Sequence, residues 1–387
     1  MARFRLIDGL RAVAAALVLL THVAFWTGAA NTDFSGGLLA RADSGVAVFF
    51  AISAFLLLRP WIRAGSAHGG HPSVRTYALR RAVRILPAYW LTLAAVLVVA
   101  ALAPGRTGGA GSPGKIVLHA LLLQGYTTQD YQSFTQTWSL TTEVTFYVFV
   151  PVIGVLLGRL ARRGAVRVYA VLLGAVGVGL AAQGLAAQWS GSAPHGGGSV
   201  LATSVLGHLA WFAAGAAVAV GSVGVVPRLG PTADRWWRTV GGSPATLVGL
   251  AALLYLVASS SLAGPRGLVT PTVTEAVVKE GLYTLIALTL LLAARWAPES
   301  PVSRAVAASP ATRWLGDISY GVFLWHVLIL QIIYLLTGWP LFSGGFAWVL
   351  CAVVSLSILV AWASATLLEQ PLLDRVHRRP RVPEPAP

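Results

Sequence analysis

Ten long apolar runs constrain this chain more than any other feature of its sequence. A helix needs about 20 apolar residues to cross the hydrocarbon core of a bilayer. The 387 residues are 56% hydrophobic and only 11% charged, whereas a soluble domain carries about 25% charged residues. Lipid is therefore the predicted main solvent. The predicted spans are 9–27, 45–62, 84–103, 138–158, 167–187, 200–222, 244–262, 275–296, 315–336 and 344–368.

Basic residues between these runs predict how the helices are oriented. If the ten runs alternate in direction, 23 of the 28 lysine and arginine residues fall on one side and four on the other. Such an excess marks the cytoplasmic side, so both termini are predicted to be cytoplasmic. The net charge of +15 is explained by this topology, without nucleic acid. The predicted fold class is an all-α, polytopic membrane protein of about ten transmembrane helices.

The rest of the chain offers little room for other chemistry. Residues 1–371 are predicted to form one transmembrane domain, and 372–387 an Arg- and Pro-rich cytoplasmic tail without stable structure. The short stretch 116–124 is expected to lie at the membrane interface or to re-enter. The single cysteine, Cys351, excludes a disulfide within the chain. The sequence has no pair of His and Asp or Glu with metal-site spacing and no Gly-rich phosphate loop.

Ionisable residues inside membrane helices are costly and are candidates for function. Arg11 and His22 are eleven residues apart in the first run, which places them on one helix face, about 16 Å apart along the axis. Arg11 lies at the cytoplasmic mouth and His22 past the middle of the membrane. The alternative is an interfacial arginine and a histidine that simply bonds to a neighbouring helix.

A second basic group opens the third run, where Arg81 and Arg84 are three residues apart and Arg80 precedes them. Residues at this spacing can point at one ligand, and an arginine fork suits phosphate. The alternative is plain anchoring at the cytoplasmic face.

Two further polar residues lie within later runs. Glu143 is about five residues into the fourth run, roughly 7–8 Å below its outer end, so a contact with His22 is geometrically allowed. His326 lies near the middle of the ninth run. Either residue could instead serve only a hydrogen bond between helices. The residues His119, His208, Glu275, Lys279 and Glu280 are weaker candidates.

Six sequence blocks in order resemble the acyltransferase 3 family of membrane O-acyltransferases. The blocks are Asp8-Gly-Leu-Arg11 with His22, Gly45–Leu57, Arg81–Arg84 with Ile-Leu-Pro87, Trp138-Ser-Leu with Glu143 and Phe146-Tyr147, Leu315–His326, and Glu369-Gln370-Pro371. They span residues 6–371. Two departures stand out: Ala54 replaces the glycine of a Ser-Gly-Phe motif, and Glu143 is the only acid in its block.

The resemblance implies transfer of an acyl group, often acetyl, from cytosolic acyl-CoA to a hydroxyl. Family acceptors include envelope carbohydrates and secondary metabolites such as macrolides, and the composition is typical of a bacterial protein of the cytoplasmic membrane. The expected partners are thus acyl-CoA, a glycan, lipid-linked sugar or macrolide-like acceptor, and the bilayer, with no nucleic acid and no metal.

Roles for the candidate residues follow from this reaction. His22 is expected to act as general base and Glu143 to orient it, while Arg11, Arg80, Arg81 and Arg84 hold the donor phosphates. The acceptor site is expected to include Trp138, Ser139, Tyr147 and His326. The rival hypothesis is a proton-coupled transporter or flippase, but no repeat relates the two halves of the sequence.

Overall fold

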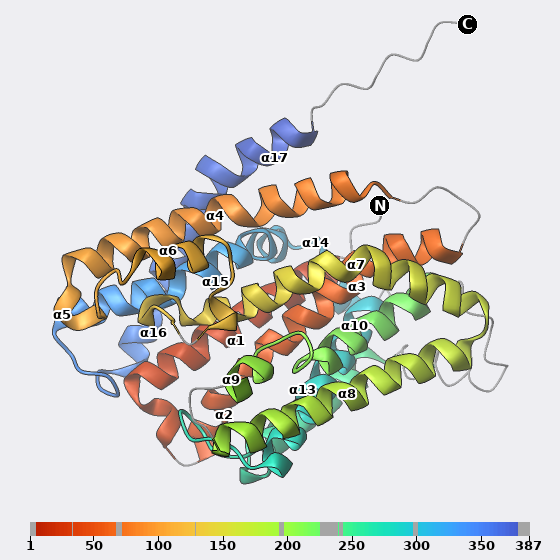
Figure 1. The fold of residues 1–387 in the computed structure, drawn as a ribbon, viewed down its shortest axis with the longest axis horizontal. Coiled ribbons are helices and arrows are strands. Elements are labelled where there is room, and N and C mark those ends of the chain that lie inside the picture. The colour runs from red at the N-terminus through yellow and green to blue at the C-terminus, as the bar shows by residue number, and fades with distance from the viewer. Residues whose placement is uncertain are drawn as a thin grey trace, which may run out of the picture.

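The computed structural model describes residues 5–32, 34–66, 72–127, 129–192, 197–224, 239, 243–296 and 301–377. Over these ranges the chain forms helices and turns without a β-strand. Eight helices are long and apolar enough to cross a membrane, which confirms the predicted all-α, polytopic class. Several of them, among them α4, α7 and α8, run roughly along the long axis of the molecule (Figure 1).

The helices match the predicted runs with shifted ends. Those of the first half are α1 (Arg5–Thr27), α2 (Phe34–Ala40), α3 (Gly45–Ser66), α4 (Val74–Leu102), α5 (Pro104–Thr107), α6 (Pro113–Ala120), α7 (Trp138–Arg162) and α8 (Ala165–Ser192). Those of the second half are α9 (Gly197–Ala202), α10 (Leu209–Ser222), α12 (Pro244–Ala258), α13 (Val273–Trp296), α14 (Pro301–Ala308), α15 (Pro310–Thr337), α16 (Phe346–Ser364) and α17 (Gln370–His377).

Two of the ten predicted spans are shorter than expected. The helices α10 and α12 have 14 and 15 residues, which corresponds to about 21–23 Å at 1.5 Å per residue. The run 200–222 is divided by a turn at 203–208, and the run 244–262 stops before Ser259 and Ser260. Hydroxyl side chains at both places bond to nearby backbone, Ser204 to Leu201 and Ser259 to Tyr255, and such bonds favour a helix end.

The second span is a broken helix, because α2 and α3 are joined by a 3₁₀ turn at Arg41–Ser44. Arg41 is buried in this break and donates to the carbonyls of Ala258, Ala263 and Gly264. A side chain at Gly45 would collide with the Ala14 carbonyl, 2.5 Å from the added Cβ. The glycine therefore lets α3 start against the middle of α1.

Residues 113–127 and 129–137, here called the inward segment, fold back against the bundle, so the stretch predicted to lie at the interface or re-enter packs against helices. The Tyr89 hydroxyl donates to the His119 carbonyl (2.7 Å), and Gln136 Nε2 donates to the Leu324 carbonyl (2.8 Å). Tyr89 and Leu324 lie midway along α4 and α15. Because these bonds hold the inward segment against α4 and α15, α7 begins inside the bundle.

Burial lowers the pKa of His119 in this segment, which favours the neutral ring.

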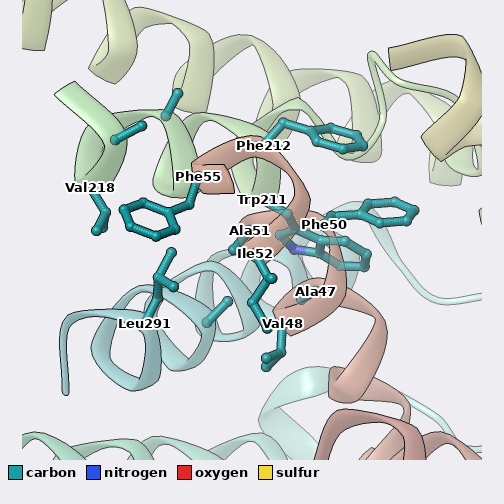
Figure 2. Close-up of a cluster of buried hydrophobic side chains, with 14 of the residues drawn as sticks. Ala47, Val48, Phe50, Ala51, Ile52, Phe55, Trp211, Phe212, Val218 and Leu291 are labelled. Carbon is teal, nitrogen blue, oxygen red and sulfur yellow. The ribbon is translucent and has the colours of Figure 1, made fainter. Parts of the chain in front are cut away.

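The hydrophobic core is centred on α3, which packs against α1, α7, α10 and α13. Figure 2 shows Phe50, Ile52 and Phe55 of α3 among Trp211, Phe212 and Val218 of α10 and Leu291 of α13. Phe50 stacks on Phe212 with ring centroids 4.6 Å apart. Small residues permit the close approach: a Cβ on Gly215 would lie 2.1 Å from the Ala51 carbonyl oxygen.

One end of the bundle carries many of the arginines, and we call it the basic end. The end of α3, the start of α4 and the α7–α8 turn lie together there, at the right of Figure 1. They contribute Arg63, Arg75, Arg80, Arg159 and Arg162. At the chain's end, α17 extends to His377, so the predicted tail is helical over 372–377, while 378–387 lie outside the described residues.

Candidate active site

A cavity in the half of the bundle nearer the basic end gathers three of the predicted arginines. Its charged members are Arg11, Arg81, Arg84 and Glu143, and we call it the arginine cavity. Helices α1, α3, α4, α7 and α15 supply its walls. The other lining residues are Val46, Phe49, Phe50, Ser53, Ile85, Ser139, Leu140, Tyr147, Ser319, Tyr320 and Phe323.

The positions of the arginines along their helices explain why they line one cavity. Arg81 and Arg84 lie one helical turn apart on α4 and face Arg11 on α1. The Nε atom of Arg81 is buried without a hydrogen-bond partner in the described part of the chain. Arg80 is exposed and does not line the cavity, because its position is rotated by about 100° from Arg81.

Glu143 is the acid of the arginine cavity. Its Oε1 accepts hydrogen bonds from the hydroxyls of Tyr147 (2.6 Å) and Ser53. Tyr147 is one turn further along α7, so the two side chains are neighbours on one helix face. Charges buried away from water are stable only when paired and hydrogen-bonded, and this carboxylate offsets part of the charge of the three arginines.

His22 and His326 form a pair further from the basic end. The Nε2 atom of His326 lies 3.3 Å from Nδ1 of His22, and their ring centroids are 5.0 Å apart at 70°. His22 Nδ1 also lies 2.7 Å from the Val18 carbonyl oxygen, and His326 Nδ1 lies 3.1 Å from that of Val322. His326 is fully buried.

These contacts favour one assignment of the ring protons. A carbonyl oxygen only accepts, so Nδ1 of each histidine must be the donor in the neutral ring. The single Nδ1–H of His22 is then shared between the Val18 carbonyl oxygen (2.7 Å) and, as the longer contact, Nε2 of His326 (3.3 Å). The remaining nitrogen, Nε2 of His22, keeps its lone pair and is the basic atom of the pair.

The expected contact between Glu143 and His22 is not among the hydrogen bonds of the described residues. Glu143 instead lines the arginine cavity together with Arg11. His22 is eleven residues further along α1, about 16 Å away along the axis. His326, from α15, takes the place beside the imidazole that Glu143 was expected to occupy.

Aromatic side chains lie between the arginine cavity and the histidine pair. Phe49 and Phe323 both line the cavity, with ring centroids 6.2 Å apart. The Phe323 centroid is also 6.1 Å from that of His326. A ligand that extends from the arginines towards His22 would therefore pass apolar side chains, and we call this section the aromatic neck.

The residues expected at the acceptor site are divided by the structure. Ser139 and Tyr147 line the arginine cavity, on the side expected to hold the donor. Trp138 packs instead against Phe50 and His208, at centroid distances of 6.4 and 5.3 Å. His326 is buried against His22 rather than open to a ligand.

The sequence analysis did not name two polar residues that line the cavity, Ser53 and Tyr320. Ser53 donates a hydrogen bond to Glu143. It could have been noticed, because it is the only hydroxyl residue in the apolar run 45–58. Tyr320 donates to the Ile85 carbonyl (3.0 Å) and joins α15 to α4. Nothing in the sequence distinguishes Tyr320 in this way, because its helix contains other tyrosine and tryptophan residues.

The weaker candidates form polar contacts of their own beside α13. His208 Nδ1 lies 3.2 Å from Glu280 Oε2, both buried, and Lys279 forms a 2.7 Å ion pair with Asp43. The described residues contain no group of three or more His, Cys, Asp or Glu side chains able to hold a metal ion.

Comparison with known proteins adds the family to this geometry. A family model described as an acyltransferase domain matches residues 4–366. Nodulation protein 10 of Rhizobium leguminosarum bv. viciae is 29% identical over 188 residues, which are 43% of this chain and 49% of that protein. The match thus spans about half the length of this curated relative. No solved structure matches significantly.

The family model covers nearly the whole chain, including α1 with Arg11 and His22, the α4 arginines, Glu143 and His326. The described part of the chain also contains eight helices of membrane-spanning length, as a membrane protein requires. The chain therefore belongs to the acyltransferase 3 family, as a multi-pass membrane protein.

Proposed function

We propose that the protein transfers an acyl group from cytosolic acyl-CoA to a hydroxyl of a carbohydrate or secondary-metabolite acceptor, with acetyl-CoA as the first donor to test. The observation that supports this proposal is that α1 and α15 each contribute residues to both the arginine cavity and the histidine pair. Helix α1 provides Arg11 and His22, and α15 provides Phe323 and His326.

The arginine cavity suits the phosphates of CoA. Guanidinium groups form bidentate hydrogen bonds with phosphate, and Arg11, Arg81 and Arg84 converge from two helices. The cavity lies towards the basic end, which the distribution of arginine and lysine predicts to be cytoplasmic, where acyl-CoA is found.

The separation between the arginines and His22 suits the rest of the donor. The pantetheine arm is long and thin, and about 16 Å of α1 separates Arg11 from His22. In this proposal the arm passes the aromatic neck of Phe49 and Phe323 and brings the thioester to the histidine pair.

His22 is the general base in the proposed reaction. Its Nε2 takes the proton of the acceptor hydroxyl while the oxygen attacks the thioester carbonyl. The tetrahedral intermediate then collapses, the C–S bond breaks, and the CoA thiolate leaves. The thiolate takes the proton from Nε2 of His22, so the base is restored and no net proton is consumed.

His326 is proposed as a positioning residue for His22, in place of a substrate contact. Its Nε2 accepts from Nδ1–H of His22 and so favours the tautomer with a basic Nε2. The same acceptor stabilises the imidazolium that forms during reaction, as a carboxylate does in other base-orienting pairs. Glu143 is proposed to balance the charge of the arginines and to hold them apart when no donor is bound.

The acceptor and the cellular location are proposed on more general grounds. The family and a bacterial relative support placement in the cytoplasmic membrane of a bacterium. Mass spectrometry of envelope glycans and secreted metabolites, with and without the protein, is the test that identifies donor and acceptor together. The expected result is a set of molecules that differ by the mass of one acyl group.

Donor binding is the second test. Replacing Arg84 by Gln should raise the Kd of the purified protein for acetyl-CoA by about tenfold, since a hydrogen bond to a charged group contributes about 1.5–3 kcal/mol. The matched control is Arg75→Gln, an exposed arginine on the same helix outside the cavity, which should leave Kd within about twofold. Equal effects of the two variants would contradict the phosphate assignment.

A transporter would give a different pattern. Purified protein with donor and acceptor should release free CoA thiol in proportion to acylated acceptor. Acceptor translocation without thioester cleavage would instead support the rival class.

A further inference from the structure

A second hollow, here called the lateral groove, lies between α4 and α7. It has a volume of about 360 Å³, which is within the range of ligand sites. Its walls are mostly apolar, with Ala78, Ala82 and Leu86 on α4 and Val144 and Val148 on α7. Leu122 of the inward segment closes it at the far end.

The groove exists because α4 and α7 are not close neighbours. The main partners of α4 are α15 and the π-helical turn Ala365–Glu369, whereas α7 packs on α3. The two helices are bridged by a hydrogen bond from the Tyr77 hydroxyl to the Tyr147 carbonyl (3.1 Å). At the groove's rim Val74 is 57% exposed and Val148 is 71% exposed. Val148 lies within the membrane-length helix α7, whereas Val74 is the first residue of α4, at the basic end. The groove is therefore exposed on an apolar side of the bundle and extends towards the basic end.

The lateral groove adjoins the arginine cavity. Arg81, Ile85 and Tyr147 line both spaces. The buried Nε of Arg81 has no hydrogen-bond partner in the described part of the chain, so an unused cationic donor stands where the polar and apolar spaces meet. Arg11 and Arg84 lie on the cavity side of this junction.

We propose that the lateral groove binds an anionic membrane phospholipid. One acyl chain lies along the apolar walls, and the phosphate accepts hydrogen bonds from Arg81. We argue the occupant from charge. An apolar groove alone would take any lipid chain, but a chain attached to an anion also provides an acceptor for the unpartnered Nε of Arg81. The reacting end of the donor is not the occupant, because His22 lies about 16 Å from the arginines along α1. This inference concerns lipid binding and does not depend on the proposed activity.

The test uses the full-length protein in detergent, with phosphatidylglycerol and phosphatidylcholine of identical chains as probes. Native mass spectrometry measures how much of each lipid stays bound. The wild type should retain phosphatidylglycerol in preference. Arg81→Gln should lower that preference by about fivefold, which is the effect of one arginine near an anionic lipid.

A groove-filling variant tests the chain's position. Ala82→Trp should lower retention of phosphatidylglycerol by about tenfold, since displacing two methylene groups from an apolar site costs that much. Ala94→Trp is the matched control, because Ala94 is an exposed alanine on α4 outside the groove, and it should bind lipid as the wild type does.

Three results would overturn the proposal. They are equal retention of the two lipids by the wild type, an unchanged preference in Arg81→Gln, and equal loss in Ala82→Trp and Ala94→Trp. Because Arg81→Gln removes charge without adding bulk, it tests the site even if the tryptophan variant does not fold.

Discussion

At the scale of single residues, proton placement in the His22–His326 pair is the most informative detail. Each Nδ1 faces a backbone carbonyl one turn earlier in its own helix, Val18 for His22 and Val322 for His326. The backbone of α1 and α15 therefore sets both tautomers. A base oriented by helix carbonyls and a second neutral ring needs no buried carboxylate, which would cost more to desolvate.

Substitution of His326 separates positioning from packing. His326→Gln places an amide oxygen near the position of Nε2 and should keep most of the acyl-transfer kcat. His326→Leu fills a similar volume without an acceptor, and kcat should fall by about tenfold or more, the order of one lost hydrogen bond to a charged group. The Kd for acetyl-CoA should stay within about twofold in both, as measured by titration. Equal kcat values for Leu and Gln would show that His326 only packs.

The sequence could predict which side chains lie together only where the two residues are close along the chain. Arg81 and Arg84, three residues apart on α4, line one cavity, and local helical spacing is enough to place them there. The partner of His22 lies 304 residues away in the sequence, and helical periodicity carries no information about which faces of distant helices meet. For this reason the sequence could not show that His22 would contact His326 instead of Glu143.

At the scale of elements, the packing of α3 depends on glycines of its neighbours. Gly215→Ala would place a methyl group against the backbone of Ala51, so α10 and α3 would have to separate. We expect this variant to lose about 1–3 kcal/mol of stability, as overpacked cores do. Gly177→Ala on α8 is the matched control, since an added Cβ there meets nothing within 4 Å. Thermal unfolding in detergent measures both, and a loss of the same size in the control would contradict the packing argument.

The sequence predicted most of the helices but not how the inward segment before α7 packs. Apolar length alone identified the helices that cross, because hydrocarbon requires every backbone group to be bonded within a helix. It did not predict the hydrogen bonds of Tyr89 and Gln136, which hold the inward segment against α4 and α15. Those bonds join side chains to backbone carbonyls, and carbonyls leave no mark in the sequence.

At the scale of the whole molecule, α3 and α15 are the two most buried of the eight membrane-length spans found in the described residues. The other six spans and the shorter α10 and α12 pack around them. Helix α15 is the most buried of the eight spans. Both central helices line the arginine cavity. The polar site is therefore held by the most enclosed elements, while outer helices such as α8 expose apolar side chains to lipid.

The orientation of the bundle can be tested with a matched pair of serines. Ser73 and Ser112 are exposed N-caps at opposite ends of the bundle, before α4 and α6. In a Cys351→Ala background, Ser112→Cys should react with a membrane-impermeant maleimide on intact cells, and Ser73→Cys only after permeabilisation. The excess of basic residues near Ser73 is the reason. The reverse pattern would place the arginine cavity on the outer side and exclude cytosolic acyl-CoA as donor.

The central claim is that His22 removes the acceptor's proton while the arginine cavity binds the donor elsewhere. The most direct measurement is acyl transfer by purified His22→Ala, with its Kd for acetyl-CoA determined on the same preparation. We predict a Kd within about twofold of wild type and a transfer rate lower by roughly 10²–10⁴-fold, the usual contribution of a general base. Normal turnover by His22→Ala would contradict the account.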